Sequence, residues 1–349
     1  MVYHHTEFNF LGNDMKPVPH KPRSNFLAQL ASVTAGLAML MTAFSGVQAA
    51  YPEKPITLIV PFAPGGSSDN VGRSIASLLG EKLKQVIVIE NVGGAGGVLG
   101  TQRAVRAAPD GYTMLIGSGS EILINKVINP RLPYDGLRDL TPLLFIATGP
   151  MVLVGRPGLP AANMKQLLEL ARAKPGALSY ASAGNGTPMH VAGELLKMRA
   201  NIFMTHIPYR GAAPALMDVM SGQVDLCVST LSAAAPHIRA GKLTVYGITS
   251  DKPSNLAPDL PVIGMTPGLE GFDLGVWFGL FMPAKTPADV LQKVQEAAAQ
   301  VLADPGVRKK LADQGLSATG TSAETLKKFM DLEVEKYQSV VKAAGIKPE

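Results

Sequence analysis

Cysteine and histidine are scarce in this chain, and their scarcity limits the chemistry it can perform. The only cysteine, Cys227, cannot form a disulfide bond within the chain, and its apolar surroundings in VDLCVST favour a small buried core residue. Beyond residue 49 the histidines are His190, His206 and His237, with no HxxxH pair and no cysteine cluster. We therefore predict no metal site, and a structural role for His206 and His237.

Charge is also sparse, since only 17% of the 349 residues are charged and the formal net charge is +5. No block rich in lysine and arginine with interleaved aromatics occurs, which argues against a nucleic-acid partner. A mild positive charge is compatible with an acidic small ligand but does not identify one. With 46% hydrophobic residues, and glycine and proline scattered through periodic segments, the chain is predicted to be globular, with roughly two domains.

The common catalytic motifs are missing. The glycine-rich stretch GGAGGVLG (93–100) follows a predicted strand, but its spacing does not match GxGxxG, and no GxxxxGK[ST] occurs. No serine lies in a GxSxG elbow, and no acid–base pair is indicated by spacing. We therefore predict no catalytic residue and no cofactor, and a secreted enzyme acting on a small organic acid is the weakest functional hypothesis.

A long apolar run occurs only near the start of the chain. The segment FLAQLASVTAGLAMLMTAFSG follows three basic residues and leads into VQAA, whose small residues Val47 and Ala49 suit cleavage before Ala50. We therefore predict that residues 1–49 are a signal peptide and that the protein is periplasmic.

Two alternatives stay open at this end of the chain. Translation begins at Met1 or at Met15, and the sequence does not decide between them. The apolar run is long enough to span a bilayer, so an uncleaved anchor is the alternative to cleavage. Downstream of Ala50 no run approaches the roughly 18 apolar residues that a second span would need.

Strand-like and helix-like patterns alternate through the rest of the chain. The run ITLIV (56–60) predicts a buried strand, and the apolar spacing from Val71 to Leu83 predicts a helix. Further strands are predicted at 86–90 and 111–118, so this alternation favours a parallel sheet covered by helices. At the far end, Thr321 and Glu324 form a predicted capping box for the last helix.

Two long apolar stretches, 143–157 and 272–284, are suited to carry the chain between two domains. The first is interrupted by Gly149-Pro150. Between the two stretches the alternation continues, with a predicted helix at 164–176 and a strand at 178–182.

The stretch PFAPGGSSD (61–69) leaves a predicted strand through two glycines and two serines. A helix N-terminus offers unpaired N–H groups and a partial positive charge, which suit an anion, and glycine lets the backbone approach it closely. Gly65, Gly66, Ser67 and Ser68 are predicted to present amides and hydroxyls, while Asp69 caps the helix.

The second half of the chain repeats this arrangement in AGNGTPMHVAGELLKM (183–198). Thr187 suits the N-cap and Pro188 the first helical position. The predicted donors are the N–H groups of Thr187, Met189 and His190. One such turn is common in α/β proteins, whereas two that face each other across a cleft would clamp a carboxylate.

Several motifs together resemble a known family. VPFAPGGSSDNVGR, VIENVGGAGGVLGTQ, PDGYT, LPYD, YASAGNGTPMHVAGELL, PYRGAAPALMDVMSGQVD and GKLTVYGITS occur in the order, and near the spacing, of the tripartite tricarboxylate transporter receptor (Bug) family of extracytoplasmic solute-binding proteins. The resemblance extends from about Tyr51 to the C-terminus. PVIGMTPG (261–268) and RANIF (199–203) depart from the family pattern.

The resemblance implies an α/β, type II periplasmic-binding-protein fold, with two α/β lobes joined by crossing strands and a ligand cleft between them. Residues 50–148 and 278–349 would form lobe 1, and residues 149–277 would form lobe 2. The implied function is capture of a small carboxylate, such as a di- or tricarboxylate, an acidic amino acid or a related acid or amide, by hinge closure. The implied partner of this monomer is a tripartite tricarboxylate-type permease. A membrane sensor kinase that reads the closed form is the alternative partner.

Carried over by position, the family's ligand contacts fall mostly on the two turns, through backbone groups and ordered water. The implied contacts are Phe62, Ala63, Gly65, Gly66, Ser67, Asp69 and Ser118 in lobe 1, and Ser182, Ala183, Gly184, Gly186, Thr187, His190 and Asp225 in lobe 2.

Some of these residues have a second interpretation. His190 either donates to a carboxylate or packs against its own helix, and Asp225 either meets a ligand amine or hydroxyl or is bound to the backbone at a strand end. Arg210 has the guanidinium geometry for an anion, but solvated surface is the favoured assignment. Trp277 and Phe278 are assigned to the packing of a crossing strand.

Overall fold

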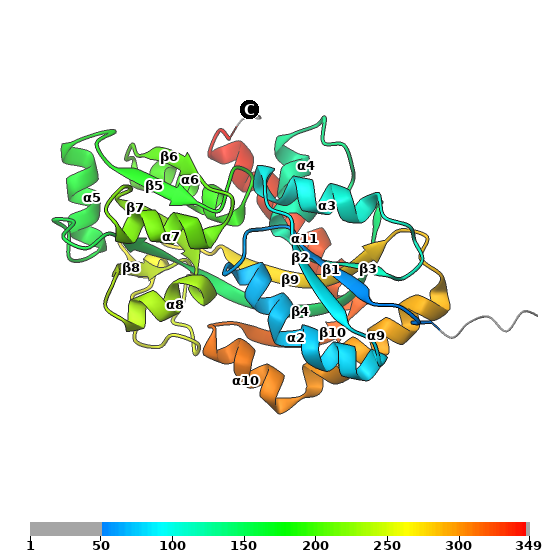
Figure 1. The fold of residues 1–349 in the computed structure, drawn as a ribbon. Helices are drawn as coiled ribbons and strands as arrows, with labels where there is room; N and C mark the ends of the chain where they lie inside the picture. The colour runs from blue at the N-terminus through cyan, green and yellow to red at the C-terminus, as the bar shows by residue number, and fades with distance from the viewer. Residues whose placement is uncertain (1–50, 347–349) are drawn as a thin grey trace, which may run out of the picture. The chain divides into compact units, whose positions relative to one another are not determined.

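The computed structural model describes residues 51–346, so the predicted signal peptide lies outside the described residues. These residues belong to one compact unit. Strands β4 (Leu140–Gly155) and β9 (Gly275–Pro283) run through its middle in Figure 1, with elements of residues 164–248 on one side and the N-terminal elements on the other. No helix of residues 51–346 is both long enough and apolar enough to cross a membrane.

The first sheet is built on the N-terminal strands. Its strand order is β2 (Ile87–Asn91), β1 (Ile56–Val60), β3 (Thr113–Ser118), β9 and β4, with β10 (Ser317–Ser322) also paired to β4. Strands β1, β2 and β3 are parallel, whereas β9, β4 and β10 pair antiparallel with their neighbours. The expected parallel sheet is therefore mixed. The crossing strands make it so, because each returns through the sheet against the direction of its neighbour.

The second sheet continues from the end of β4. Met151–Gly155 of that strand pair antiparallel with β7 (Leu226–Thr230), which is followed by β5 (Ser179–Ser182) and β6 (Thr205–Pro208) in parallel. β8 (Thr244–Ile248) pairs antiparallel with the other edge of β4. We call the elements around the first sheet lobe 1 and those around the second sheet lobe 2.

Strand β4 is the physical link between the lobes. Residues 140–150 pair with β9 in the first sheet, and residues 151–155 pair with β7 in the second. The Gly149-Pro150 dipeptide lies where the partner strand changes, and the apolar stretch continues through it as one strand. The division of the chain into 50–148, 149–277 and 278–349 stays a prediction.

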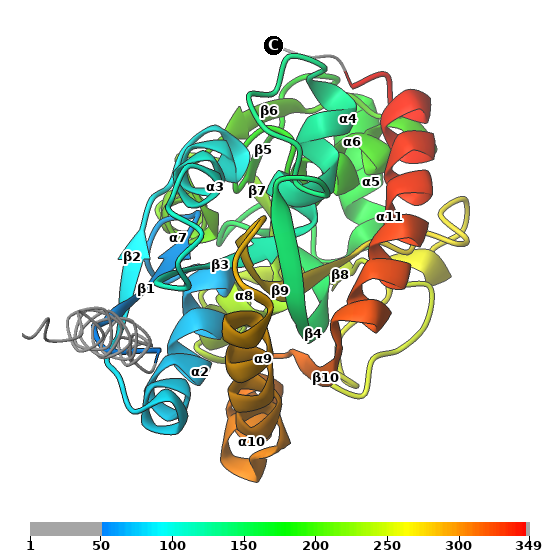
Figure 2. The same cartoon turned by 90° about the vertical axis from the view of Figure 1, so that its right-hand side faces the viewer.

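Helices cover both sheets. Figure 2 shows the last helix running along one side of the molecule, where it contacts β10 and β4 of the first sheet and one helix of lobe 2. The helices and helical turns are α2 (Ser67–Leu83), η1 (Ala95–Gly97), α3 (Val98–Val105), η2 (Ser120–Ile124), α4 (Asn125–Ile128), α5 (Met164–Ala173), α6 (Pro188–Ala200), α7 (Ala212–Met220), α8 (Leu231–Arg239), η3 (Ile263–Met265), α9 (Ala288–Ala303), α10 (Pro305–Asp313) and α11 (Ala323–Ala343).

Two helix starts differ from the sequence predictions. Helix α2 begins at Ser67, before the predicted cap Asp69, because Gly66 is extended and acts as the N-cap. The last helix is capped by the Ser322 hydroxyl, which accepts from the Thr325 N–H at 3.3 Å, and not by Thr321. Thr321 instead pairs with Phe145 between β10 and β4, so it is part of the sheet.

Candidate functional site

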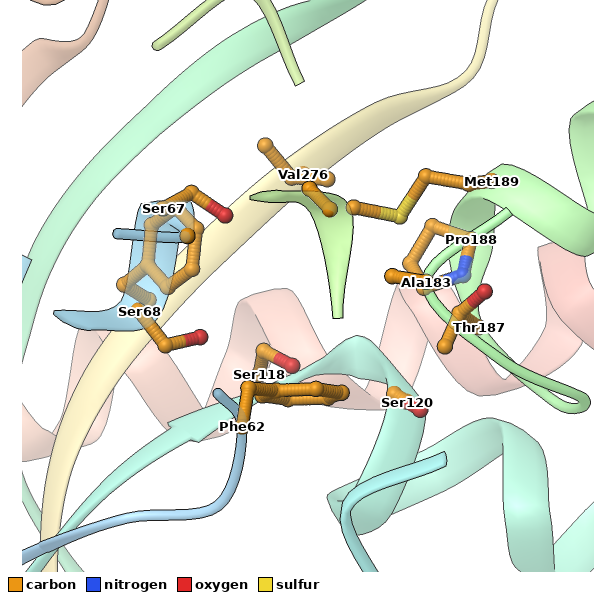
Figure 3. Close-up of a pocket in the computed structure, with 13 residues that line it drawn as sticks. Phe62, Ser67, Ser68, Ser118, Ser120, Ala183, Thr187, Pro188, Met189 and Val276 are labelled. Atoms are coloured by element: carbon orange, nitrogen blue, oxygen red, sulfur yellow. The ribbon is translucent and has the colours of Figure 1, made fainter. Parts of the chain in front are cut away.

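A cavity lies between the two lobes (Figure 3). No charged side chain lines it. One side carries the hydroxyls of Ser67 and Ser68, and Thr187 and Met189 face them from the opposite side. Its lining residues are Phe62, Gly66, Ser67, Ser68, Ser118 and Ser120 from lobe 1, Ala183, Thr187, Pro188, Met189 and Ala212 from lobe 2, and Val276 and Phe278 from β9.

The lobes touch directly beside this cavity. The Ala63 N–H donates to the Arg210 carbonyl at 3.3 Å. The Ser120 hydroxyl oxygen lies 2.6 Å from the Gly96 carbonyl and 3.0 Å from the Gly186 carbonyl, one in each lobe, and can donate to either. These contacts join the two lobes next to the cavity.

The first turn presents the N-terminus of α2 to the cavity. Among the described residues, no acceptor pairs with the N–H groups of Ser67, Ser68 and Asp69, because the residues before them do not continue the helix. The 17-residue helix adds the partial positive charge of its dipole at this end. This side of the cavity is therefore suited to an anion.

Asp69 supports this turn instead of capping the helix as predicted. Its carboxylate accepts from the Gly65 N–H at 2.9 Å, from Arg73 Nε at 2.9 Å and from Asn91 Nδ2 at 3.0 Å. Partial burial raises the pKa of Asp69, but the hydrogen bonds from Arg73, Gly65 and Asn91 outweigh it and lower the pKa overall. The carboxylate is thus fully engaged behind the turn and holds Gly65 in its left-handed conformation, with φ of 79°.

The second turn satisfies most of its own amides. Thr187 is the N-cap, as predicted, and its hydroxyl accepts from the His190 N–H at 3.3 Å. The Thr187 N–H donates to the Gly184 carbonyl at 3.3 Å, and the Gly186 N–H donates to His190 Nδ1 at 3.3 Å. Of the three predicted donors, only the Met189 N–H keeps no acceptor within the described residues. This turn therefore offers fewer amides to a ligand than the sequence suggested.

His190 and His206 stack behind the second turn, with ring centroids 4.2 Å apart. His206 Nε2 lies 2.7 Å from the Ser182 hydroxyl, and the His206 ring also stacks on Tyr180. Burial, with smaller contributions from His190 and Lys197, lowers the pKa of His206 to about 3. His206 is therefore neutral in the folded protein at ordinary pH.

This neutral histidine makes stability depend on pH. The pKa of His206 is lower in the folded protein than in the unfolded chain, so stability is complete above about pH 6.5 and is lost as the pH falls from there toward 3. The loss is at most about 1.4 kcal/mol per pH unit for this one proton. Urea unfolding of wild type and His206→Gln between pH 4 and 8 should show a shallower slope in the variant. Equal slopes would contradict the prediction.

A third helix N-terminus reaches the cavity and was not predicted as part of the site. Ala212, the first residue of α7, lines the cavity, and Gly211 before it has φ of 151°, which only glycine adopts easily. The sequence could have indicated this third helix N-terminus through the PYRGAAPALM segment, because a glycine precedes a helix-like pattern there, as in the other two turns. Ser68, Ser120, Met189 and Phe278 are further lining residues that the implied contact set lacks.

The structure brings only part of the implied contact set to the cavity wall. Phe62, Gly66, Ser67, Ser118, Ala183 and Thr187 line it, whereas Ala63, Gly65, Asp69, Ser182, Gly184, Gly186, His190 and Asp225 do not. Most of the second group support the two turns from behind.

Asp225 lies at the opposite end of the second sheet from the cavity. Its carboxylate accepts from Arg156 Nε at 2.9 Å and from the Ser179 N–H at 3.0 Å. It precedes β7 beside the start of β5, whereas the cavity lies beyond the end of β5 at Ser182. In this structure Asp225 is hydrogen-bonded to the backbone at a strand end, away from the cavity. Arg210 has an exposed side chain, and only its carbonyl takes part in the contact between the lobes.

No group of three or more metal-ligating side chains occurs within residues 51–346. Two lobes that are joined by crossing strands, with a cavity at helix N-termini that no charged side chain lines, define the solute-binding class of protein.

Comparison with known proteins identifies the family. Residues 71–346 match the model of the tripartite tricarboxylate transporter family receptor. The chain is 36% identical over 313 residues to the UPF0065 protein in the tcbD-tcbE intergenic region of Pseudomonas sp. (strain P51), covering 88% of this chain and 93% of that one. The chain therefore belongs to the tripartite tricarboxylate transporter receptor family. Like the family, it is a binding protein and not an enzyme.

Solved structures agree in fold. The periplasmic binding protein BugD matches with a TM-score of 0.82 and 32% identity, covering 86% of this chain and all of that one. R. palustris Rpa4515 with adipate matches with a TM-score of 0.83 and 30% identity over the same shares of the two chains. MatC (Rpa3494) from Rhodopseudomonas palustris with bound malate matches with a TM-score of 0.79 and 31% identity, covering 83% and 100%. The predicted periplasmic-binding-protein fold is confirmed, and relatives of this chain bind carboxylates.

Proposed function

We propose that this protein is a periplasmic receptor that captures a small carboxylate by hinge closure and delivers it to a tripartite tricarboxylate-type permease. The observation that carries the proposal is the convergence of α2, α6 and α7 on one cavity between the lobes. Each contributes its first residues to the wall, and no charged side chain lines it. An anion would be held there by amides, hydroxyls and helix dipoles.

The proposed ligand is a small carboxylate that carries a short carbon chain. Phe62, Met189, Val276 and Phe278 supply an apolar part of the wall, which suits a short carbon chain. The adipate and malate in the related structures combine these two features.

Closure would follow from ligand contacts to both lobes. A ligand that reaches the α2 amides on one side and the α6 and α7 termini on the other gains all of its contacts only when the lobes meet. Binding therefore shifts the population toward the closed form. A permease would then recognise that form. The alternative partner, a sensor kinase, would recognise the same closed form. No contact among the described residues favours the kinase over the permease. We retain the expectation of a monomer.

The experiment is a thermal-shift screen of the protein purified from the periplasm. The panel holds malate, succinate, adipate, citrate, glutamate and nicotinate, each paired with its amide. At least one acid should raise the melting temperature and bind with a Kd in the micromolar range or tighter, which is about −8 kcal/mol. If no acid stabilises the protein, the proposed function is wrong. Recovery of the protein from the cytoplasm alone would contradict its periplasmic location.

A further inference from the structure

A carboxyl group lies directly behind the cavity wall. Glu121, in the π-helical turn η2, has no exposed surface and directly follows two lining residues, Ser118 and Ser120. Within residues 51–346 it forms no ion pair, and its Oε2 lies close to Gly97, where an added Cβ would be 3.1 Å away. Burying an unpaired charge costs free energy, so this carboxyl group must be stabilised by something other than a cation.

Both oxygens of this carboxyl contact Ser118. The Ser118 backbone N–H donates to Glu121 Oε1, and the Ser118 hydroxyl oxygen lies 2.8 Å from Oε2. An ionised carboxylate only accepts hydrogen bonds, so it would hold the Ser118 hydroxyl proton away from the cavity. A protonated carboxyl can donate to the serine oxygen instead, which frees the serine O–H to turn toward a ligand.

The surroundings favour the protonated form at neutral pH. Burial raises the pKa of Glu121 to about 8, and the hydrogen bonds from its own backbone N–H and from Ser118 lower it by less. Two other titratable groups on adjoining elements are phenols. Tyr134, after α4, donates to the Glu121 carbonyl at 2.9 Å, and Tyr337, on α11, lies against Gly119. Burial raises both phenol pKa values, so both stay neutral. Lys126 on α4 is paired with Asp135.

We propose that Glu121 is a positioning residue that determines which end group of the ligand binds to Ser118. This inference rests on the proposed function. As a neutral acid, Glu121 lets Ser118 donate a hydrogen bond to a ligand carboxylate. As an anion, it turns Ser118 into an acceptor and places a negative charge behind it, which disfavours a carboxylate and favours an amide, hydroxyl or ammonium group. The preference for acid over amide therefore reverses as the pH rises through the titration of this one group.

The test is a pH profile of binding by isothermal titration calorimetry. The probes are malate, adipate and their monoamides, measured between pH 6.5 and 9.5 with wild type and Glu121→Gln. The glutamine variant is isosteric with the neutral acid, since its amide oxygen accepts from the Ser118 N–H and its amide nitrogen donates to the Ser118 oxygen. Wild type should bind the acid at least about 10-fold more weakly at pH 9.5 than at pH 6.5, and the monoamide no more weakly. Glu121→Gln should show no such change.

Ser118→Ala is the second variant, so that the test does not depend on whether Glu121→Gln folds. Without the hydroxyl, acid binding at pH 6.5 should weaken and the loss at high pH should shrink. If wild type binds acids equally at both pH values, or if both variants keep the full wild-type profile, the role of Glu121 is overturned while the proposed function stands. If no probe and no acid of the panel binds wild type at any pH, the proposed function fails and this inference fails with it.

Discussion

A Gly96→Ala substitution is expected to weaken ligand binding about 100-fold or more while the protein stays folded. Gly96 lies in η1 of lobe 1, and a Cβ added there would be 2.1 Å from the Asn185 carbonyl oxygen of lobe 2. Backbone on both sides leaves little room to relax, and overpacking of this kind costs about 3 kcal/mol, which corresponds to about 100-fold in affinity. Opening of the lobes removes the clash, so the substitution raises the free energy of the closed form relative to the open form.

Gly158→Ala is the matched control. Gly158 has φ of 72°, close to the 58° of Gly96, so alanine suffers a similar backbone strain of roughly 1–2 kcal/mol at either position. No heavy atom lies within 4 Å of a Cβ added at Gly158. Calorimetry with the acid that most stabilises wild type, together with melting temperatures, separates the two effects. Comparable affinity in both variants would contradict closure through the contact between Gly96 and Asn185.

A pair of substitutions at Ser67 should isolate one backbone amide of the proposed anion site. Ser67 is the first residue of α2, a position that accepts proline, and the extended backbone of Gly66 suits the residue before a proline. Ser67→Ala removes only the hydroxyl, whereas Ser67→Pro removes the hydroxyl and the N–H. A hydrogen bond to a charged group contributes about 1.5–3 kcal/mol. The proline variant should therefore bind acids about 10- to 150-fold more weakly than the alanine variant.

The helix itself provides the control for this pair. Far-ultraviolet circular dichroism and the melting temperature should differ little between the two variants, because the N–H at this position has no protein acceptor to lose. The neutral amide of the same acid should discriminate less between them, since its hydrogen bond to the N–H is not charge-assisted. If the two variants bind acids equally, the Ser67 amide is not a ligand contact and the anion site must lie at α6 or α7.

Much of the fold could be predicted because its signals are local. The apolar run 56–60 became β1, the pattern from Val71 to Leu83 became most of α2, and Thr187 capped α6. Each depends on side chains within a few residues of one another, so the sequence records them directly. The resemblance to a family added the two-lobe arrangement, which no local pattern specifies.

The candidate site was harder to predict because it depends on which groups the fold leaves unpaired. Asp69 has the residue type and position of a helix cap, yet Arg73 and Asn91 draw its carboxylate to the Gly65 amide. His190 has the position of a donor, but the Thr187 hydroxyl takes its N–H. Such competition among nearby partners is settled by angles and distances that residue types do not encode.

The sequence by itself determined that helices follow the two glycine-rich turns, and it placed the start of α6 at its Thr187 cap, because capping and backbone freedom are properties of a few neighbouring residues. Only the tertiary structure decided that three helix starts share one cavity, that Glu121 is buried behind it, and that Asp225 lies at the far end of a strand. These placements arise from strand pairings between residues far apart in the chain, such as β3 with β9 and β4 with β7. Pairings over that separation bring together groups whose proximity the local sequence does not specify.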